Sequence, residues 1–249
     1  MMWVAARREA SALFRSPFAW AVLAAVQFLI AYQFLAQIDL FMTYLPKIRS
    51  QPHPFGVTQL VVVPTFGVTA LLLLMLIPVL TMHTFSGERR AGTLHLWYSA
   101  PIRLSALVGG KFIGVGSVLL VILGLNALMP LTLLWGTQLD LGTYLGGLLG
   151  LLGIMLSGTA LGLFCSALTA QPAVAAIATL TCLLSLWLID WTSQLDQAPG
   201  MLAQISMLAH FQSLGTGLVE AADLAYFGGL TLGALALTIW RLEGDRCAF

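Results

Sequence analysis

Long apolar stretches alternate with short polar segments along almost the whole chain. A helix needs about 20 residues to cross a hydrocarbon layer at about 1.5 Å per residue. The stretches are too long for the strands of a membrane barrel and lack a period of two, so the pattern indicates an all-α membrane protein. We predict six membrane-spanning helices, at about residues 18–38, 59–83, 108–135, 144–169, 172–190 and 224–241.

The segment before the first of these stretches, residues 1–16, has its own helical pattern. Arg7, Arg8 and Arg15 recur on one face, and apolar residues occupy the other. This pattern predicts a short amphipathic helix that lies in the plane of the lipid headgroups, followed by a six-helix membrane domain over residues 17–249. An ordinary basic flank of the first span is the alternative interpretation.

The largest polar segment between two apolar stretches covers residues 85–111. From Glu88 to Ser99 the apolar residues recur at helical spacing, and Pro101 follows. The spacing predicts a second amphipathic helix over 88–99 that ends before the proline. Its polar side chains would face a partner, whereas a solvated loop that only fixes the topology is the alternative.

Small residues recur at four-residue spacing in several of the predicted spans. Such spacing lets helix backbones approach closely in lipid, so we expect close packing at these positions, and a contact with a second copy is an alternative. The positions are Gly142, Gly146 and Gly150 in the fourth span, Gly110 and Gly114 in the third, and Gly229 and Gly233 in the sixth.

Composition and charge fit a membrane protein with one basic side. The chain is 59% hydrophobic and 8% charged, against about 25% charged residues in a typical soluble domain. Its net charge of +1 does not suggest a nucleic-acid partner. If the N-terminus is cytoplasmic, the outer segments hold only Lys47 and Arg49, which predicts cytoplasmic termini. The basic residues of the inner segments are then Arg7, Arg8, Arg15, Arg89, Arg90, Arg103, Lys111, Arg241 and Arg246.

Few residues offer chemistry of their own. The centres of the predicted spans carry no ionisable residues, which argues against an ion-coupled carrier. Neither Lys47 nor Lys111 completes a phosphate-binding loop, so this chain is not expected to hydrolyse ATP. The histidines and cysteines lack the spacing of metal ligands, and we expect no metal site. A stand-alone carrier or channel remains an alternative, as does an intramembrane hydrolase that would use Ser157 with His210.

Three stretches resemble one family. Residues 85–111, FSGERRAGTLHLWYSAPIRLSALVGGK, are similar to the first cytoplasmic loop of ABC-2 permeases, and residues 8–20, REASALFRSPFAW, resemble the N-terminal pattern of the gliding-motility-type branch. Residues 208–227, LAHFQSLGTGLVEAADLAYF, are similar to the segment before the last helix in that branch. The matching loop residues are Glu88, Arg89, Gly92, Thr93, Leu94, Pro101, Gly110 and Lys111.

The resemblance implies a permease subunit of an ATP-driven exporter or force-transmitting complex in the bacterial cytoplasmic (inner) membrane. ATP and Mg²⁺ would be bound by separate cytoplasmic ABC ATPase subunits, and no cofactor by this chain. The second permease half would be another copy or a paralogue with an extracytoplasmic domain, and membrane lipid would surround both.

The resemblance also implies roles for three groups of residues. A coupling helix would contact the ATPase, the N-terminal helix would be the elbow helix, and residues 191–223 would form an outer re-entrant segment. The coupling residues would be Glu88, Arg89, Arg90, Gly92, Thr93, Leu94 and Pro101; the elbow residues Arg7, Arg8 and Arg15; and the outer residues His210, Phe211, Gly217 and Asp223.

Overall fold

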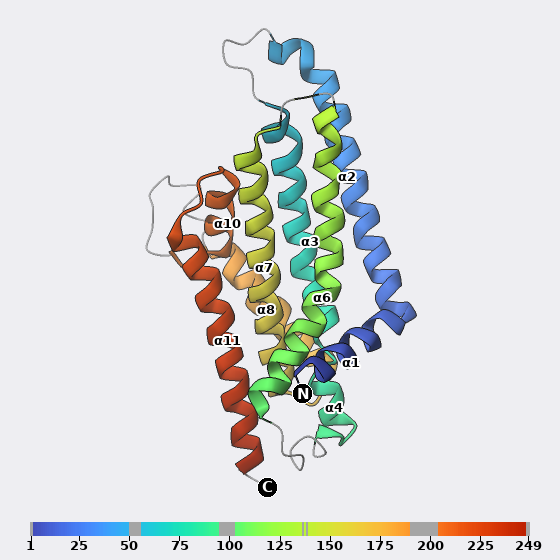
Figure 1. The fold of residues 1–249 in the computed structure, drawn as a ribbon, viewed down its shortest axis with the longest axis vertical. Coiled ribbons are helices and arrows are strands. Elements are labelled where there is room, and N and C mark those ends of the chain that lie inside the picture. Colours follow the sequence, from blue (N-terminus) through green and yellow to red (C-terminus); the bar gives the residue numbers. More distant parts are fainter. Residues whose placement is uncertain are drawn as a thin grey trace.

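The computed structural model describes residues 2–49, 56–94, 103–135, 137, 139–189 and 204–247 of the 249-residue chain. The secondary structure of these residues is helical, and no strand occurs among them. Most of the helices run side by side in one elongated bundle (Figure 1). The prediction of an all-α membrane protein is confirmed for the part of the chain described.

Within the described residues, five helical stretches are long and apolar enough to cross a membrane. Because their middles are almost wholly apolar, lipid and the neighbouring helices can cover every face. They are α2 (Pro17–Arg49), the π-helical turn η1 (Thr58–Val62) continued by α3 (Val63–Thr81), α6 (Leu104–Leu131), α7 (Leu141–Leu168) and α11 (Ala221–Cys247). A 3-10 turn, η2 (Thr132–Trp135), follows α6. Both α2 and α11 extend well beyond the predicted spans 18–38 and 224–241.

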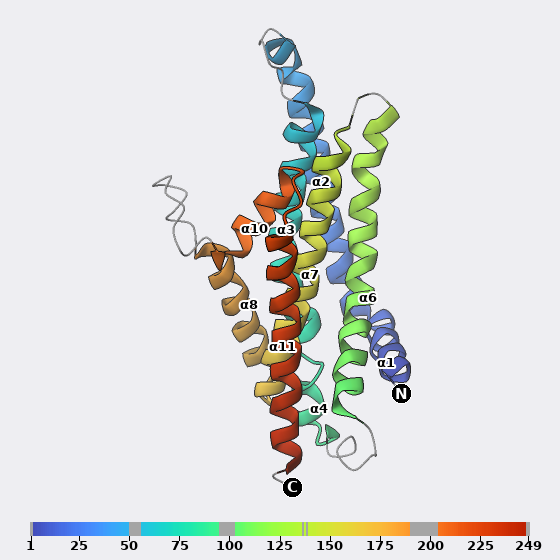
Figure 2. The ribbon, with the colours of Figure 1, turned by 60° about the vertical axis from the view of Figure 1, so that its left-hand side comes forward.

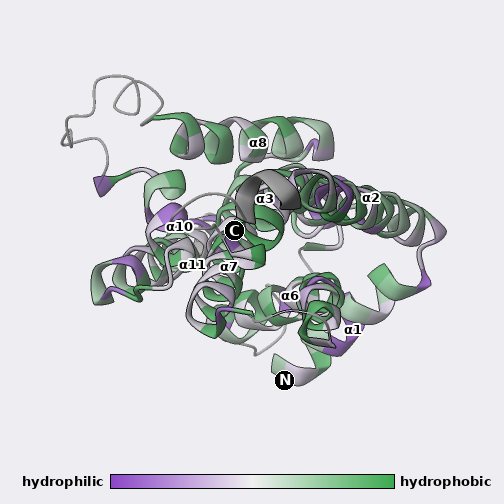
Figure 3. Ribbon diagram, turned by 90° about the horizontal axis from the view of Figure 1, so that it is seen from above, coloured by the Kyte–Doolittle hydropathy of each residue, from purple (hydrophilic) through white to green (hydrophobic). Residues whose placement is uncertain are grey.

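The predicted span at 172–190 corresponds to a shorter helix. α8 covers Pro172–Leu188 and has 17 residues, about 25 Å of helix at about 1.5 Å per residue. It lies at the edge of the bundle, where it packs on α3 and α7 (Figures 2 and 3). Residues 190–203 lie outside the described residues, and six spans therefore stay a prediction.

α7 is the central helix, and its glycines let its neighbours approach closely. A Cβ added at Gly146 would lie 2.1 Å from Leu214 O of α10 (Met207–Gly215), and one at Gly150 would lie 2.8 Å from the Phe211 ring. Real Cβ atoms do not approach other atoms so closely, so these contacts require glycine. By contrast, an added Cβ at Gly233 would meet nothing within 4 Å among the described residues, and the predicted packing role is not seen there.

Both termini lie at the same end of the bundle (Figure 1). α1 (Met2–Arg15) crosses the bundle at this end, and α4 (Ser86–Arg90) lies beside it. The nine basic residues predicted for the inner side lie in α1, in α4, in the last part of α11, or at the start of α6, which Arg103 immediately precedes. We call this the basic end; α10 lies toward the opposite end.

Candidate functional site

A short helix and a tight turn follow α3 at the basic end. Gly92 N–H donates to Arg89 O at 3.2 Å, and Thr93 N–H donates to Glu88 O at 3.0 Å. With a φ of 68° at Gly92, these bonds form a Schellman ending of α4. Glycine adopts this left-handed conformation at no steric cost, which explains its place after the two arginines. We call residues 86–94 the α4 segment.

The amphipathic helix predicted through this segment is wrong for the described residues, because Gly92 ends it after one turn and a half. Ala91 is exposed, whereas Leu94 is buried with Phe85 and Leu104, so Ala91 and Leu94 do not share one apolar face. Residues 95–102, which include the predicted Pro101, lie outside the described residues.

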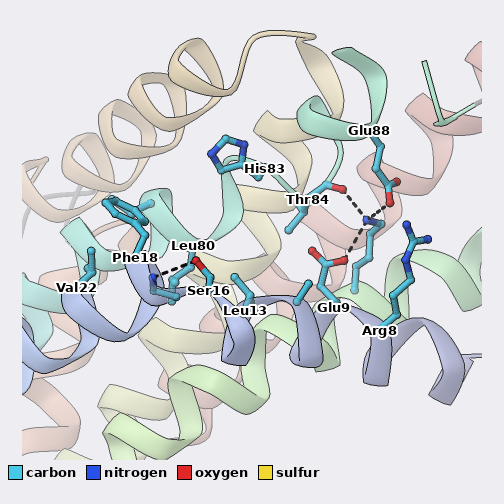
Figure 4. Close-up of a pocket in the computed structure, with 14 residues that line it drawn as sticks. Arg8, Glu9, Leu13, Ser16, Phe18, Val22, Leu80, His83, Thr84 and Glu88 are labelled. Atoms are coloured by element: carbon cyan, nitrogen blue, oxygen red, sulfur yellow. Dashed lines mark hydrogen bonds and ion pairs between the residues drawn. The ribbon is translucent and has the colours of Figure 1, made fainter. Parts of the chain in front are cut away.

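Lys111 is a buried cation at the centre of the basic end. Its side chain is 3% exposed, and its ammonium lies 2.6 Å from Thr84 O, 3.1 Å from Glu88 Oε1 and 3.3 Å from Glu9 Oε2. An ammonium has three N–H donors, so each donor has an acceptor. Figure 4 shows Glu9, Thr84 and Glu88 converging on one point from different elements. Lys111 therefore links α1, the α4 segment and α6.

Two glycines allow α1 to reach this position on α6. A Cβ added at Gly110 would lie 2.7 Å from both Ala5 Cβ and Met2 O, and one at Gly114 would lie 2.7 Å from Glu9 Cβ. The close approach predicted for these glycines is confirmed, and α1 is their partner. It places Glu9 within reach of the Lys111 ammonium.

Arg89 links the α4 segment to the last part of α11. Its guanidinium donates to the carboxylate of Asp245, which also pairs with Arg241 at 3.0 Å. The side chains of Arg89 and Asp245 are 24% and 18% exposed. Charge-assisted pairs of this kind are about twice as strong as neutral hydrogen bonds. Glu88 and Arg89 thus pair with other parts of the chain while staying partly exposed, and their contact with an ATPase stays a prediction.

Ser166 of α7 is a further anchor for the segment. Its hydroxyl oxygen accepts from Phe85 N–H and Ser86 N–H, both at 3.1 Å, and its O–H lies 3.2 Å from Met82 O. The side chain is fully buried. These bonds satisfy backbone groups at the start of α4 that a helix leaves unpaired.

Only a small part of the α4 segment is exposed. Arg90, Ala91 and Gly92 are exposed, whereas Thr93 is half-buried, and its hydroxyl donates to Glu88 O at 3.3 Å. The predicted elbow residues Arg7, Arg8 and Arg15 are also exposed, along α1. The exposed turn is therefore surrounded by residues that fix it to four helices.

Sequence reasoning missed three residues of this site. Glu9 stands in the N-terminal motif beside Arg8, but nothing in the sequence connects it with Lys111. Ser166 and Asp245 belong to helices far along the chain, and only the packing of α7 and α11 brings them to the α4 segment.

A second polar cluster joins α10 to α11 toward the opposite end. His210 Nδ1 lies 2.6 Å from Asp223 Oδ1, and Ser213 Oγ donates to Asp223 Oδ2 at 2.8 Å. His210 Nε2 faces Gln204 O at 3.1 Å, and the ring stacks on Tyr226. Both ring nitrogens of His210 thus face an oxygen atom of a neighbouring residue. The side chain of Asp223 is almost fully buried, so this group fixes one helix on the other.

The other two predicted outer residues place α10 against α7. Gly217 has a φ of 87°, and a Cβ added there would lie 2.8 Å from Thr143 N. The Phe211 ring occupies the space beside Gly150. The structure therefore brings the predicted outer residues together, although whether residues 191–223 are re-entrant stays a prediction.

Asp140 begins α7 at the same end. Its carboxylate accepts from Thr143 Oγ1 at 2.7 Å and from Gly142 N–H at 3.0 Å. The bond from the Thr143 side chain, followed by the one from Gly142, lowers the pKa of Asp140 below its ordinary value. Its backbone N–H donates to Thr58 Oγ1 at 2.9 Å, which connects α7 to η1.

The residues considered for an intramembrane hydrolase do not form a catalytic pair among the described residues. Ser157 Oγ donates to Gly153 O at 2.7 Å inside α7, and both nitrogens of His210 already face Asp223 and Gln204. A serine nucleophile requires a base within hydrogen-bonding distance. The geometry does not support this alternative.

These observations define a multi-pass helical membrane protein in which one loop is tied to several helices at the basic end. A family model described as "ABC-2 family transporter protein" matches residues 3–193, most of the chain. The chain therefore belongs to the ABC-2 family and is a permease component of an ABC transporter. A comparison with curated proteins gives no match.

Proposed function

We propose that this chain is the permease subunit of an ATP-driven exporter or force-transmitting complex, and that a separate ABC ATPase moves it through the α4 segment. The observation that carries this proposal is the connection of the exposed turn Arg90–Gly92 to four helices. Lys111 links the segment to α1 and α6, Asp245 links it to α11, and Ser166 links it to α7.

This arrangement allows the α4 segment to transmit a movement of the turn to the helical bundle. A partner that displaces the turn pulls on α1, α6, α7 and α11 together. Charge-assisted bonds hold the segment to α1, α6 and α11, and the buried Ser166 hydroxyl holds it to α7. Binding and hydrolysis of ATP, with Mg²⁺, take place in the ATPase. The permease then switches between two packings of the same helices as rigid bodies.

The topology follows from the distribution of charge. The basic end faces the cytoplasm, as basic residues do in multi-pass proteins of the bacterial cytoplasmic membrane. Both termini and the α4 segment are then cytoplasmic. α8 serves as a short fifth span, and α10 lies on the outer side. A second permease half, either another copy or a paralogue with an extracytoplasmic domain, completes the pathway.

Charge reversal at Arg90 tests the proposed contact. Arg90→Glu is expected to weaken co-purification with the ABC ATPase about tenfold, or about 1.4 kcal/mol. It should also abolish the stimulation of ATP hydrolysis, while membrane insertion and thermal stability stay unchanged. Arg246→Glu is the matched control, because Arg246 is another exposed arginine at the basic end but lies outside the α4 segment.

Two outcomes would contradict the proposal. Equal ATPase binding by the wild type and Arg90→Glu would exclude the turn as the contact. Substrate flux that is independent of ATP, in vesicles that contain only this chain, would support a stand-alone carrier or channel instead.

A further inference from the structure

A cavity of about 330 Å³ lies at the basic end where α1, the start of α2 and the end of α3 meet (Figure 4). Its walls differ in character. One side is apolar and includes Leu13, Phe18 and Leu80, whereas Arg8, Glu9, His83, Glu88 and Lys111 supply charged and polar groups on the other. An occupant that suits both walls has a hydrocarbon part and a polar head.

The cavity lies at the depth of a membrane interface. Trp3 of α1 is 73% exposed, and Phe18 and Trp20 at the start of α2 are 61% and 51% exposed. The Trp20 indole N–H donates to Phe14 O at 2.7 Å, so its polar edge is satisfied while its rings stay exposed. Exposed tryptophans typically lie at the level of the lipid headgroups. A phospholipid is therefore the molecule with access to this cavity.

The charges of the polar wall select the headgroup. The Lys111 ammonium faces two carboxylates, so one negative charge of Glu9 and Glu88 is not balanced by it. Glu88 Oε2 is buried without a hydrogen-bond partner among the described residues. In Figure 4 one oxygen of Glu9 turns toward the point where the dashed lines meet, and the other turns away from it. This wall is complementary to a cation that donates hydrogen bonds.

Further hydrogen-bond donors line the same cavity. Arg8 extends from α1, and His83 is exposed in the turn after α3. Both are donors that suit a phosphate. A headgroup that carries a phosphate and a primary ammonium thus suits both the carboxylates and the Arg8 guanidinium, whereas the headgroup of phosphatidylglycerol offers no cation to the carboxylates. A quaternary ammonium cannot donate a hydrogen bond to them.

We infer that this cavity binds a single phospholipid with a primary-amine headgroup, of the phosphatidylethanolamine type. The ammonium pairs with the Glu9 and Glu88 carboxylates, the phosphate with Arg8 and His83, and an acyl chain lies along Phe18 and Leu80. The lipid then contacts α1, α2, α3 and the α4 segment together.

Headgroup competition tests this inference with the unaltered chain. The protein is placed in nanodiscs that contain equal amounts of phosphatidylethanolamine, phosphatidylcholine and phosphatidylglycerol with the same acyl chains. Lipids retained after detergent extraction are then counted by native mass spectrometry. We expect one tightly held lipid, with phosphatidylethanolamine enriched about tenfold, the ratio that one hydrogen bond to a charged group provides.

Variants locate the site. Ala12 is exposed and lines the cavity, so Ala12→Phe is expected to fill it and to abolish the enrichment. Val4→Phe adds a similar ring on an exposed position of α1 outside the cavity and should leave the enrichment unchanged. Retention of the three lipids in equal amounts would overturn the inference, as would full phosphatidylethanolamine enrichment in Ala12→Phe. Lipid counts require no ATPase, so they are independent of the proposed ATPase contact.

Discussion

Replacing Lys111 by methionine probes the connection between the α4 segment and the bundle. Lys111→Met replaces the alkyl part of the side chain by an apolar group of similar size and removes the ammonium that Glu9, Glu88 and Thr84 O share. Two carboxylates then face each other without a cation. Removing one partner of a fully buried ion pair costs about 3–5 kcal/mol, whereas an exposed pair contributes about 0–1 kcal/mol.

The structure places this cluster between those limits. The Lys111 side chain is 3% exposed, and those of Glu9 and Glu88 are 18% and 15% exposed. We therefore expect Lys111→Met to destabilise the chain by about 2–4 kcal/mol. Unfolding by SDS in mixed micelles, followed by tryptophan fluorescence, measures this loss. The same variant should bind the ATPase without stimulating ATP hydrolysis. The exposed turn that contacts the ATPase remains, but the α4 segment is no longer linked to α1 and α6 through Lys111.

A double-mutant cycle separates the ion pair from general damage. In a Glu88→Gln background, Lys111→Met should lower the free energy of unfolding by less than it does in the wild-type background. The difference, the coupling energy, should be about 0.5–3 kcal/mol. Glu243→Gln is the control background, because Glu243 is an exposed acid at the basic end outside the cluster. Additive effects in the Glu88→Gln background, or wild-type stability of Lys111→Met, would refute the reasoning.

Three further predictions concern the backbone and the far end of the bundle. Gly92→Ala should destabilise the α4 segment by about 1–2 kcal/mol because of its positive φ, and Gly92→Asn should recover part of this loss in the SDS assay. Gly146→Ala should lower the stability of the fold by about 1–3 kcal/mol, because the added methyl group overpacks against α10. At Gly116 an added Cβ meets nothing within 4 Å, so Gly116→Ala should leave the thermal stability unchanged or raise it. The lowered pKa of Asp140 stabilises the fold above its ordinary value of 3.8, and this contribution should disappear as the pH falls below that value. The acid sensitivity should be absent from Asp140→Asn in stability measurements from pH 6 to pH 2.5, and equal acid profiles for the two proteins would contradict this.

Much of the fold follows from the apolar pattern, because long helices are the structures that satisfy their backbone groups in lipid. The residues at which the helices begin and end follow less well from the apolar pattern. α2 continues through residues after 38 because a mixed sequence can extend a helix beyond the hydrocarbon. The short helix α4 ends at Arg90 because Gly92 adopts a left-handed backbone conformation, and the apolar periodicity that continues to Ser99 does not reveal this ending.

The composition of the candidate site was predictable in part. Glu88 and Lys111 stand in one motif, and the structure shows that they pair although 23 positions separate them in the sequence. The direction in which Glu88 and Arg89 point was not predictable, because it depends on Asp245 and on the approach of α1. Those contacts require the packing of helices from both ends of the chain, which no local pattern contains.

The central claim, that an ATPase contacts the exposed turn of the α4 segment, can be tested by photo-crosslinking. A photoreactive amino acid replaces Arg90, or Leu232 as a control that is 70% exposed in the middle of α11. After irradiation of intact cells, the cross-linked polypeptides are identified by mass spectrometry. The account predicts an adduct with a polypeptide that contains the nucleotide-binding motifs of an ABC ATPase from position 90, and none from position 232. Adducts at position 90 without such a polypeptide, or the same ATPase adduct from both positions, would contradict it.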